Sequence, residues 1–171
     1  MNGYEFYPED GSTLYEEEAR ELSEQARSLW LRLNFAGEYS EGIRPVQIQG
    51  RKYLPMFPAR DSVYTIAQVR EKFLEVFSKE FTDKTLNTAI ANKDLLEYNG
   101  NVYAACKKNK GETSYNSWAD HIQDDGDGKF TVVMGVSMPP DGNTVYVELP
   151  AEKNAAGYFV FTDYPYWDQS E

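Results

Sequence analysis

Apolar residues first recur regularly between residues 13 and 33, where they predict an amphipathic helix. The intervals alternate between three and four residues, which is the period of an α-helix. The apolar positions are Tyr15, Ala19, Leu22, Ala26, Leu29 and Leu33, with Trp30 beside them. Thr13 and Glu16 form a capping-box pattern at the predicted start, and Gly37 follows the predicted end.

A short β-hairpin and two further helices are predicted next. The hairpin covers residues 46–53, with Gln49-Gly50 at its turn. Thr65-x-x-Gln68 is a second capping box, and the helix that follows it is predicted to run to about residue 79. Thr82 is the predicted N-cap of a shorter helix. The inward positions of that helix are Leu86, Ala89 and Ile90.

From residue 94 onward the apolar positions alternate, which predicts β-strands. Asn99-Gly100 lies between two alternating runs and is a strong hairpin signal, because a type I′ turn needs positive φ at both central residues. The predicted strands cover residues 95–98, 101–106, 118–122, 130–138, 143–149 and 158–162. Turns are predicted at residues 124–128, 139–142 and 151–157. The last strand is apolar on both faces, so we expect it to be central and covered.

Helices early in the chain and strands late in it predict an α+β fold. We expect the N-terminal helices to pack on one face of a curved antiparallel sheet. An NTF2-like or cystatin-like arrangement fits this order, as do other α+β folds. The 171 residues are enough for one hydrophobic core, and neither a linker nor a repeat divides them. We therefore expect a single domain over residues 1–171, in which residues 1–11 form an arm or a frayed end.

The charge of the chain restricts its partners. The net charge is −11, which argues against nucleic acid and anionic membranes because both require a basic face. Residues 1–41 carry −7, residues 42–119 carry +4 and residues 120–171 carry −8. Such blocks are typical of solvated faces that favour solubility, and they also permit a basic protein partner.

The sequence is compatible with two cellular locations. It has no run of about 20 apolar residues that could span a membrane. Its first ten residues are polar and acidic, unlike a signal peptide. The protein is either exported, with a signal or lipid anchor outside this sequence, or cytoplasmic.

No motif predicts catalysis, a cofactor or a metal. A Cys–His nucleophilic pair could use only Cys106 and His121, and Cys106 ends an apolar strand where a buried thiol is common. Zinc requires more His or Cys ligands than the chain has. The acidic run before Gly128 fails the EF-hand pattern because Gln123 and Met134 fall at positions one and twelve, although a looser calcium site stays open. The sequence also does not decide whether two carboxylates form a pair of the kind that glycosidases use.

The order of motifs resembles the IseA family of bacterial cell-wall DL-endopeptidase inhibitors. The resemblance covers residues 14–164. The matching motifs are a long helix ending in Leu29-Trp30, the hairpin from Ile48 to Tyr53, a helix before Phe81-Thr82, the hairpin from Leu96 to Tyr103, a glycine-containing loop leading to Trp118, and a final strand ending Asp163-Tyr164.

This resemblance implies an exported, non-enzymatic inhibitor of hydrolases that cut peptidoglycan and have a papain-like Cys–His domain. Family members act through an acidic surface and an inhibitory loop in which an acid lies between glycines. In this sequence the literal match is Gly126-Asp127-Gly128, preceded by Asp124 and Asp125. A competing hairpin tip is formed by Asn99, Gly100 and Asn101, which lacks the acid.

Two alternatives to the inhibitor remain at this point. One is an NTF2-like small-molecule binder, which requires a deep cavity of at least ~300 Å³. The other is an acidic cytoplasmic interaction or immunity protein. For the inhibitor we expect a monomer without a cofactor whose partner is a basic cell-wall hydrolase.

Overall fold

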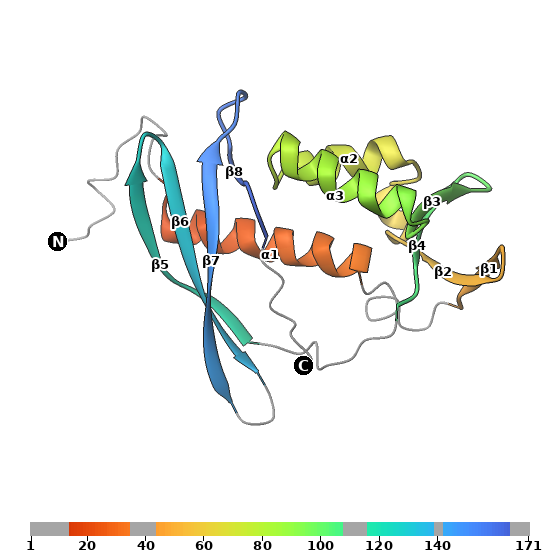
Figure 1. The fold of residues 1–171 in the computed structure, drawn as a ribbon, viewed down its shortest axis with the longest axis horizontal. Coiled ribbons are helices and arrows are strands. Elements are labelled where there is room, and N and C mark those ends of the chain that lie inside the picture. The colour runs from red at the N-terminus through yellow and green to blue at the C-terminus, as the bar shows by residue number, and fades with distance from the viewer. Residues whose placement is uncertain (1–13, 35–43, 108–115, 139–141, 165–171) are drawn as a thin grey trace.

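The computed structural model describes residues 14–34, 44–107, 116–138 and 142–164, and these residues form an α+β fold (Figure 1). The predicted fold class is therefore confirmed. The helices are α1 (Glu16–Asn34), the short 3₁₀ helix η3 (Ala59–Asp61), α2 (Ile66–Leu74) and α3 (Lys79–Ala91). The strands are β1 (Val46–Ile48), β2 (Arg51–Pro55), β3 (Leu95–Tyr98), β4 (Asn101–Ala105), β5 (Asn116–Gly126), β6 (Lys129–Met138), β7 (Asn143–Lys153) and β8 (Phe159–Phe161).

The strands form two antiparallel sheets, where we had expected one curved sheet. The first sheet has the order β1-β2-β4-β3, and the second has the order β5-β6-β7-β8. The early hairpin joins the Asn99-Gly100 hairpin because β2 pairs with β4, with Tyr53 opposite Ala105. Alternating apolar positions identify strands but not their partners, so the sequence pattern could not separate the two sheets.

Both predicted hairpin turns of the first sheet are confirmed. Gln49 and Gly50 have φ of 52° and 82°, and Asn99 and Gly100 have φ of 49° and 77°. Two consecutive residues with positive φ are typical of the type I′ turn, whose twist matches that of the flanking strands. Turn chemistry thus determines the register of both hairpins.

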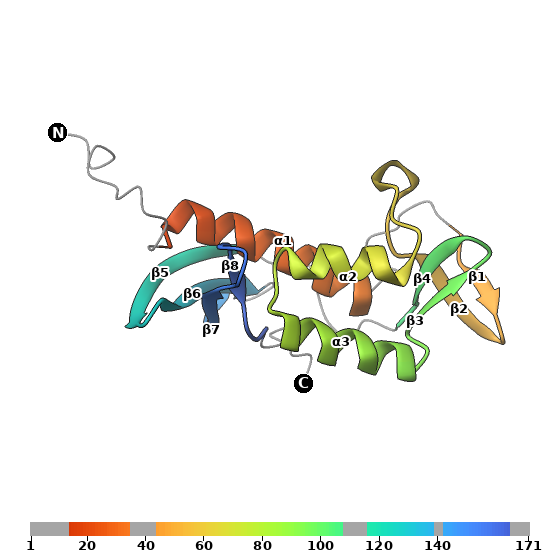
Figure 2. The same cartoon turned by 90° about the horizontal axis from the view of Figure 1, so that it is seen from above.

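Helix α1 connects the two sheets. It lies against one face of the second sheet and reaches toward β4 of the first (Figures 1 and 2). Its inward stripe agrees with the predicted one, because Ala19, Leu22, Ala26, Leu29 and Leu33 are all buried. Thr13, Gly37 and the predicted arm over residues 1–11 lie outside the described residues.

The second and third helices begin and end differently from the prediction. The Thr65 capping box is confirmed, but α2 ends at Leu74 and α3 has Ser78 as its N-cap. The prediction that Thr82 is an N-cap is wrong, because this residue lies inside α3 and is fully buried. Ile90 is 37% exposed, so the prediction that it faces inward is also wrong.

The break between these helices closes an edge of the second sheet. Strand β8 was expected to be central, but it is the last strand of its sheet. The Phe161 N–H donates to the Val76 carbonyl at 2.8 Å, and the Ser78 N–H donates to the Phe161 carbonyl at 2.8 Å. The linker therefore satisfies the outer hydrogen-bonding groups of Phe161 at the end of β8 and covers this edge strand, which suits a strand that is apolar on both faces.

A shared core holds these layers together. Phe73, Phe77, Leu86, Leu149 and Phe161 are almost fully buried within one cluster that spans both sheets and all three α-helices. The Phe77 ring contacts the rings of Phe81 and Tyr164, at centroid distances of 4.7 and 5.8 Å. The predicted turn over residues 151–157 is shorter than expected, because β7 continues to Lys153.

Candidate functional site

The tip of the β5–β6 hairpin is a two-residue turn. Gly126 pairs with Lys129, and the intervening Asp127 and Gly128 have φ of 57° and 74°. These values are typical of a type I′ turn with Asp-Gly at its centre. Asp124 and Asp125, which were predicted to lie in the turn, belong instead to the end of β5. They are brought close to the turn by a β-bulge between Asp124 and Gly126.

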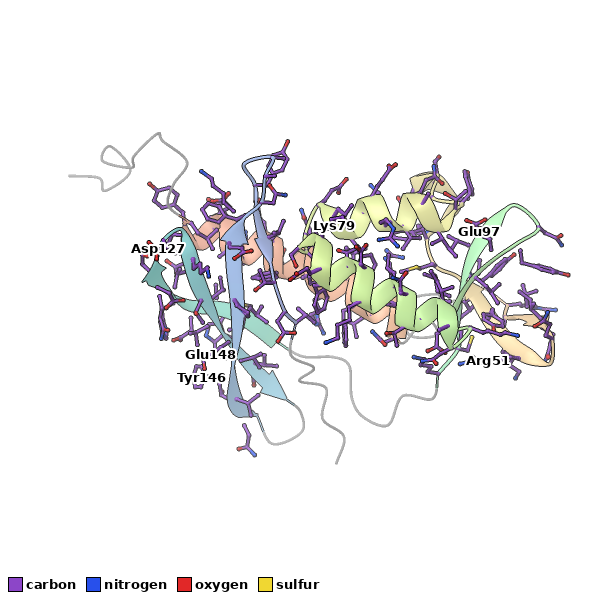
Figure 3. All side chains as sticks on the ribbon, turned by 45° about the horizontal axis from the view of Figure 1, so that its top comes forward. Arg51, Lys79, Glu97, Asp127, Tyr146 and Glu148 are labelled. Atoms are coloured by element: carbon purple, nitrogen blue, oxygen red, sulfur yellow. The ribbon has the colours of Figure 1, made fainter. Side chains whose placement is uncertain are left out.

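Two of the three aspartates at this tip are engaged within the hairpin. The Gly126 N–H donates to Asp124 Oδ1 at 2.9 Å, and the Thr131 hydroxyl donates to Asp125 Oδ2 at 2.6 Å. Among the described residues, neither a hydrogen bond nor an ion pair involves the Asp127 carboxylate. Figure 3 shows Asp127 at one extremity of the molecule. All three carboxylates are exposed, and Asp127 is the one that makes no hydrogen bond or ion pair among the described residues.

The surroundings of the tip are also acidic. The described residues from β5 to Tyr164 include seven Asp or Glu and two Lys, a net charge of −5. Residues 44–107, which form the first sheet with α2 and α3, include seven acidic and ten basic side chains, a net charge of +3. The fold thus separates the charge into two lobes. The first lobe is the basic one and consists of the first sheet with α2 and α3, and the second lobe is the acidic one and consists of the second sheet. The β5–β6 tip lies at the end of the second lobe.

The competing tip, at Asn99 and Gly100, lies on the first sheet at the other end of the molecule. The neighbouring Glu97, at that end in Figure 3, is held by the fold because its carboxylate accepts the Ile66 N–H at 2.6 Å. Asn101 is held as well, because its side-chain oxygen accepts the Val102 N–H at 2.9 Å. This tip is neutral and lies beside the exposed ring of Tyr98.

The structure places Cys106 directly after a strand of the first sheet and His121 on a strand of the second. Cys106 follows β4 and packs against the core, and burial raises the pKa of its thiol against the smaller opposing effect of Lys52. His121 lies exposed on β5, with Nδ1 2.8 Å from Asp120 Oδ2. A thiol with a raised pKa is poorly suited to nucleophilic catalysis, which requires the thiolate.

The described ranges hold no group of three or more His, Cys, Asp or Glu side chains that could bind a metal ion. The calcium possibility at Asp124 and Asp125 therefore finds no ligand set in that part of the chain. Within the same ranges, no helix is long and apolar enough to cross a membrane.

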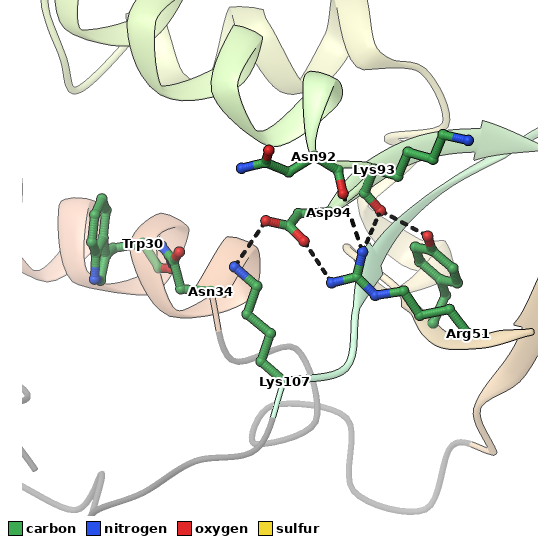
Figure 4. A network of polar contacts seen from close by, with 8 residues as sticks. Trp30, Asn34, Arg51, Asn92, Lys93, Asp94 and Lys107 are labelled. Carbon is green, nitrogen blue, oxygen red and sulfur yellow. Dashed lines mark hydrogen bonds and ion pairs between the residues drawn. The ribbon is translucent and has the colours of Figure 1, made fainter.

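An ion-pair network that sequence patterns did not reveal lies at the end of α3 (Figure 4). Asp94 accepts from Arg51 at 2.6 Å and pairs with Lys107 at 3.1 Å. Burial alone raises the pKa of Asp94, but the hydrogen bonds from Arg51 and Lys107 outweigh it, so its pKa is lowered. The Tyr53 hydroxyl donates to the Lys93 carbonyl at 2.7 Å. The network fastens the first sheet to α3.

A cleft of about 400 Å³ lies beside this network, between α1 and α3. Its apolar wall includes Trp30, Phe81 and Tyr164, and its polar wall includes Asp94 and Lys107. The volume reaches the range that the small-molecule alternative requires. The cleft lies at the surface between two helices. A second hollow, of about 860 Å³, lies between the first turns of α1 and the Trp118-Ala119 stretch of β5.

Comparison with models of protein families and with curated protein sequences returns no match to this chain.

Proposed function

We propose that the chain is a non-enzymatic inhibitor of bacterial cell-wall DL-endopeptidases. In this proposal the β5–β6 tip enters the groove that holds the Cys–His pair of the hydrolase. The observation that carries the proposal is the exposed, unpaired carboxylate of Asp127 on a turn held by the hairpin. The order of sequence motifs supports the same conclusion.

The geometry of the tip suits insertion into a groove. Gly126 and Gly128 have no side chains, so the backbone on either side of Asp127 can approach a partner closely. The bulge and the two internal hydrogen bonds hold the tip in one conformation. Preorganisation of this kind reduces the conformational entropy that binding costs.

The charge of the second lobe supports a basic partner. An acidic surface accelerates encounter with a positively charged hydrolase, and salt weakens this effect because it screens exposed charges. Asp127 at the extremity of this lobe would then meet cationic or N–H groups near the catalytic pair. The resemblance also implies an extracytoplasmic location, which remains part of the proposal.

The test is inhibition of peptidoglycan cleavage by a purified papain-like DL-endopeptidase. We expect the chain to inhibit, and Asp127→Lys to weaken inhibition at least about tenfold, which corresponds to about 1.4 kcal/mol. The matched control is Asn101→Lys, which places the same charge beside the other tip. Thermal unfolding should show both variants folded, each with a loss of about 1 kcal/mol at most, because Lys is strained at the positive φ of residue 127 and Asn101→Lys removes the hydrogen bond from the Val102 N–H.

The paired variants separate the possible outcomes. Loss of inhibition only in Asn101→Lys would move the inhibitory contact to the first sheet. Absence of inhibition and of binding across several such hydrolases would overturn the proposed function itself.

The cleft between α1 and α3 favours a second candidate, a small-molecule carrier. Under this alternative, Thr88→Trp, which adds bulk to the cleft wall, abolishes binding of a ligand extracted with the native protein. A protein purified from its native source that carries no bound small molecule would contradict this candidate.

A further inference from the structure

The second sheet has two edge strands, β5 and β8, and the fold covers them differently. The α2–α3 linker covers β8, where it bonds both backbone groups of Phe161. Strand β5 pairs with β6 on one side, and no backbone hydrogen bond between described residues reaches its other side. Figure 1 shows β5 as the outermost strand, across the sheet from β8. Its 11 residues therefore form a long edge whose outward N–H and C=O groups are open to another chain.

Two stretches of β5 have the regular geometry that strand pairing requires. Residues 116–119 pair with residues 134–137 of β6 without interruption, and residues 121–124 pair with residues 130–133 in the same way. The bulges fall outside these stretches, at Asp120 and Asp125. A bulge twists a strand and interrupts the ladder locally. The edge can therefore form a hydrogen-bonded ladder with a short added strand on either side of Asp120.

The charged side chains of β5 are all acidic at neutral pH. Asp120, Asp124 and Asp125 are exposed, and the strand contains neither Lys nor Arg. Antiparallel pairing of two copies centred on Ile122 would bring Asp120 of each copy close to Asp124 of the other, and like charges at such positions destabilise a strand pair. The edge therefore disfavours a second copy of this chain, but the same charges attract a basic strand.

The start of β5 borders the hollow of about 860 Å³ beside α1, which adds further carboxylates next to the edge. The basic residue of its lining, Arg20, is already paired with Glu24 at 2.9 Å. Like charges one helical turn apart destabilise a helix, so the acids of this lining do not serve α1 by pairing with one another. Among the described residues, no hydrogen bond or ion pair involves the four glutamates of the lining, which are Glu16, Glu17, Glu18 and Glu21.

We propose that the outer edge of β5 binds an extended, basic segment of a partner protein by strand addition. In this mode backbone hydrogen bonds supply affinity and alternate side chains supply specificity. Alternate residues of a strand lie on the same face, so basic residues at every second position can follow the aspartates of β5. Near Trp118, which is 36% exposed, one of these cations can stack on the indole and pair with the glutamates of the hollow.

The combination of an open edge and carboxylates favours a peptide over a small cation. A metal ion or a polyamine would use the carboxylates and leave the outward backbone groups of β5 without a partner. A basic strand satisfies both. The proposal rests on the edge and its charge, and it does not depend on the inhibitory role proposed for Asp127.

The first test is an NMR titration of the whole chain with three peptides: (Lys-Val)4, (Glu-Val)4, and a (Lys-Val)4 peptide that is methylated at every backbone nitrogen. We expect (Lys-Val)4 to shift the Trp118 indole N–H and the amides of residues 121–124, and to slow hydrogen exchange along β5. The acidic peptide should cause no shift. The methylated peptide keeps the charge but cannot donate backbone hydrogen bonds, so it should bind at least about tenfold more weakly. Equal binding by the methylated peptide, or no shift with any peptide, would overturn the proposal.

Two pairs of variants separate the edge from the net charge of the chain. Asp120→Lys should weaken (Lys-Val)4 binding about fivefold or more, whereas Glu148→Lys, which places the same charge on the central strand β7, should weaken it less than about twofold. The double variant Glu17→Gln/Glu21→Gln should also weaken binding. Its matched control is Glu71→Gln/Glu75→Gln, which removes two exposed acids at the same spacing from α2 and its C-cap. Equal losses within either pair would mean that net charge alone attracts the peptide, and would overturn the proposal.

Two further measurements complete the test. If the chain alone forms a dimer in sedimentation and the dimer protects the β5 amides from exchange, a second copy occupies the edge and the proposal is wrong. Asp127→Lys should weaken peptide binding no more than Glu148→Lys does, although it is expected to weaken inhibition. Failure of this inference and failure of the proposed inhibitory function are therefore separate results.

Discussion

Both lobes of this chain contain hairpins with type I′ turns, but the lobes differ in strand length and in their contacts with the helices. The first sheet has strands of three to five residues and is tied to α2 and α3 by contacts that cross between elements. The second sheet has three strands of ten or eleven residues and packs one face on α1, and among the described residues no helix covers its other face (Figure 2). The first lobe is organised around internal contacts, whereas the second presents the β5–β6 tip to solvent.

Polar contacts show the same difference. In the first lobe they join distant elements, as Arg51 joins Asp94 and Arg70 joins Asp83. In the second lobe they stay local, as Thr131 bonds Asp125 within one hairpin. Removing a contact between elements uncouples parts of the core, whereas removing a local one changes only the surface. The loss in free energy of unfolding on substitution is therefore expected to be largest in the shared core and smallest at the acidic tip.

The largest effect is expected for Phe77→Ala, at the junction of the lobes. Phe77 is 1% exposed, and its ring contacts those of Phe73, Phe81 and Tyr164. Truncation leaves a cavity that should lower the free energy of unfolding by about 3–5 kcal/mol. Urea denaturation measures the change, with the exposed Tyr146→Ala as control at within about 0.5 kcal/mol. Equal effects of the two variants would contradict a shared core.

A smaller effect is expected for Asp94→Asn in the first lobe. The change keeps the shape of the side chain but removes the charge that Arg51 and Lys107 share. We expect a loss of about 1–3 kcal/mol, because two partly exposed cations lose the carboxylate that they share. Asp127→Asn in the second lobe is the matched control. A stability loss at Asp127 as large as that at Asp94 would remove the distinction between the lobes.

The pH dependence of stability tests the same network. The pKa of Asp94 is lower in the folded state than in the unfolded chain, where an Asp titrates near 3.9. The network's stabilisation is therefore fully present above that unfolded value and is lost as the pH falls through the folded pKa. The difference between wild type and Asp94→Asn should stay constant from pH 7 to about pH 5 and shrink below about pH 4. Chemical denaturation across this range checks the sign, and a difference that grows in acid would contradict it.

The two hairpin tips should respond alike to a change in turn chemistry. Gly100→Ala and Gly128→Ala each place a Cβ at positive φ, with nothing within 4 Å of it. The cost is backbone strain alone, about 1 kcal/mol in either lobe. Thermal unfolding of the two variants should agree closely. A marked difference would mean that one tip is held by contacts beyond its own turn.

The smallest stability effect is expected at the acidic tip. Asp127→Asn should change the free energy of unfolding by less than about 0.5 kcal/mol, because the carboxylate is exposed and the turn needs only Asp or Asn at this position. Calorimetry measures the change. A loss above 1 kcal/mol would show that Asp127 serves the fold instead of a partner.

Local signals predicted the elements well where one residue type decides the conformation. Asn99-Gly100, Gln49-Gly50 and the Thr65 capping box all form as expected, because positive φ and free helix N–H groups are local requirements. Thr82 shows the limit of such signals. It suits an N-cap by residue type, but Ser78 takes that role once the preceding residues pair with Phe161.

The candidate site was predicted in part. The acidic residues and glycines identified the β5–β6 tip, but not that Asp124 and Asp125 belong to the strand while Asp127 alone stays unpaired. The open edge of β5 carries no sequence motif, because strand pairing alone decides which strand lies at the edge of a sheet. Arg51, Asp94 and Lys107 likewise come together only through the fold.

The sequence by itself determined the α+β class, the main helix, the hairpin turns and the acidic ends of the chain. Each depends on periodicity, backbone preference or charge within a few residues. Only the tertiary structure decided that there are two sheets, that the α2–α3 linker closes the edge of β8, and that the charge separates into two lobes. These features depend on which strands pair and which faces are buried, and contacts between residues far apart in the chain decide both.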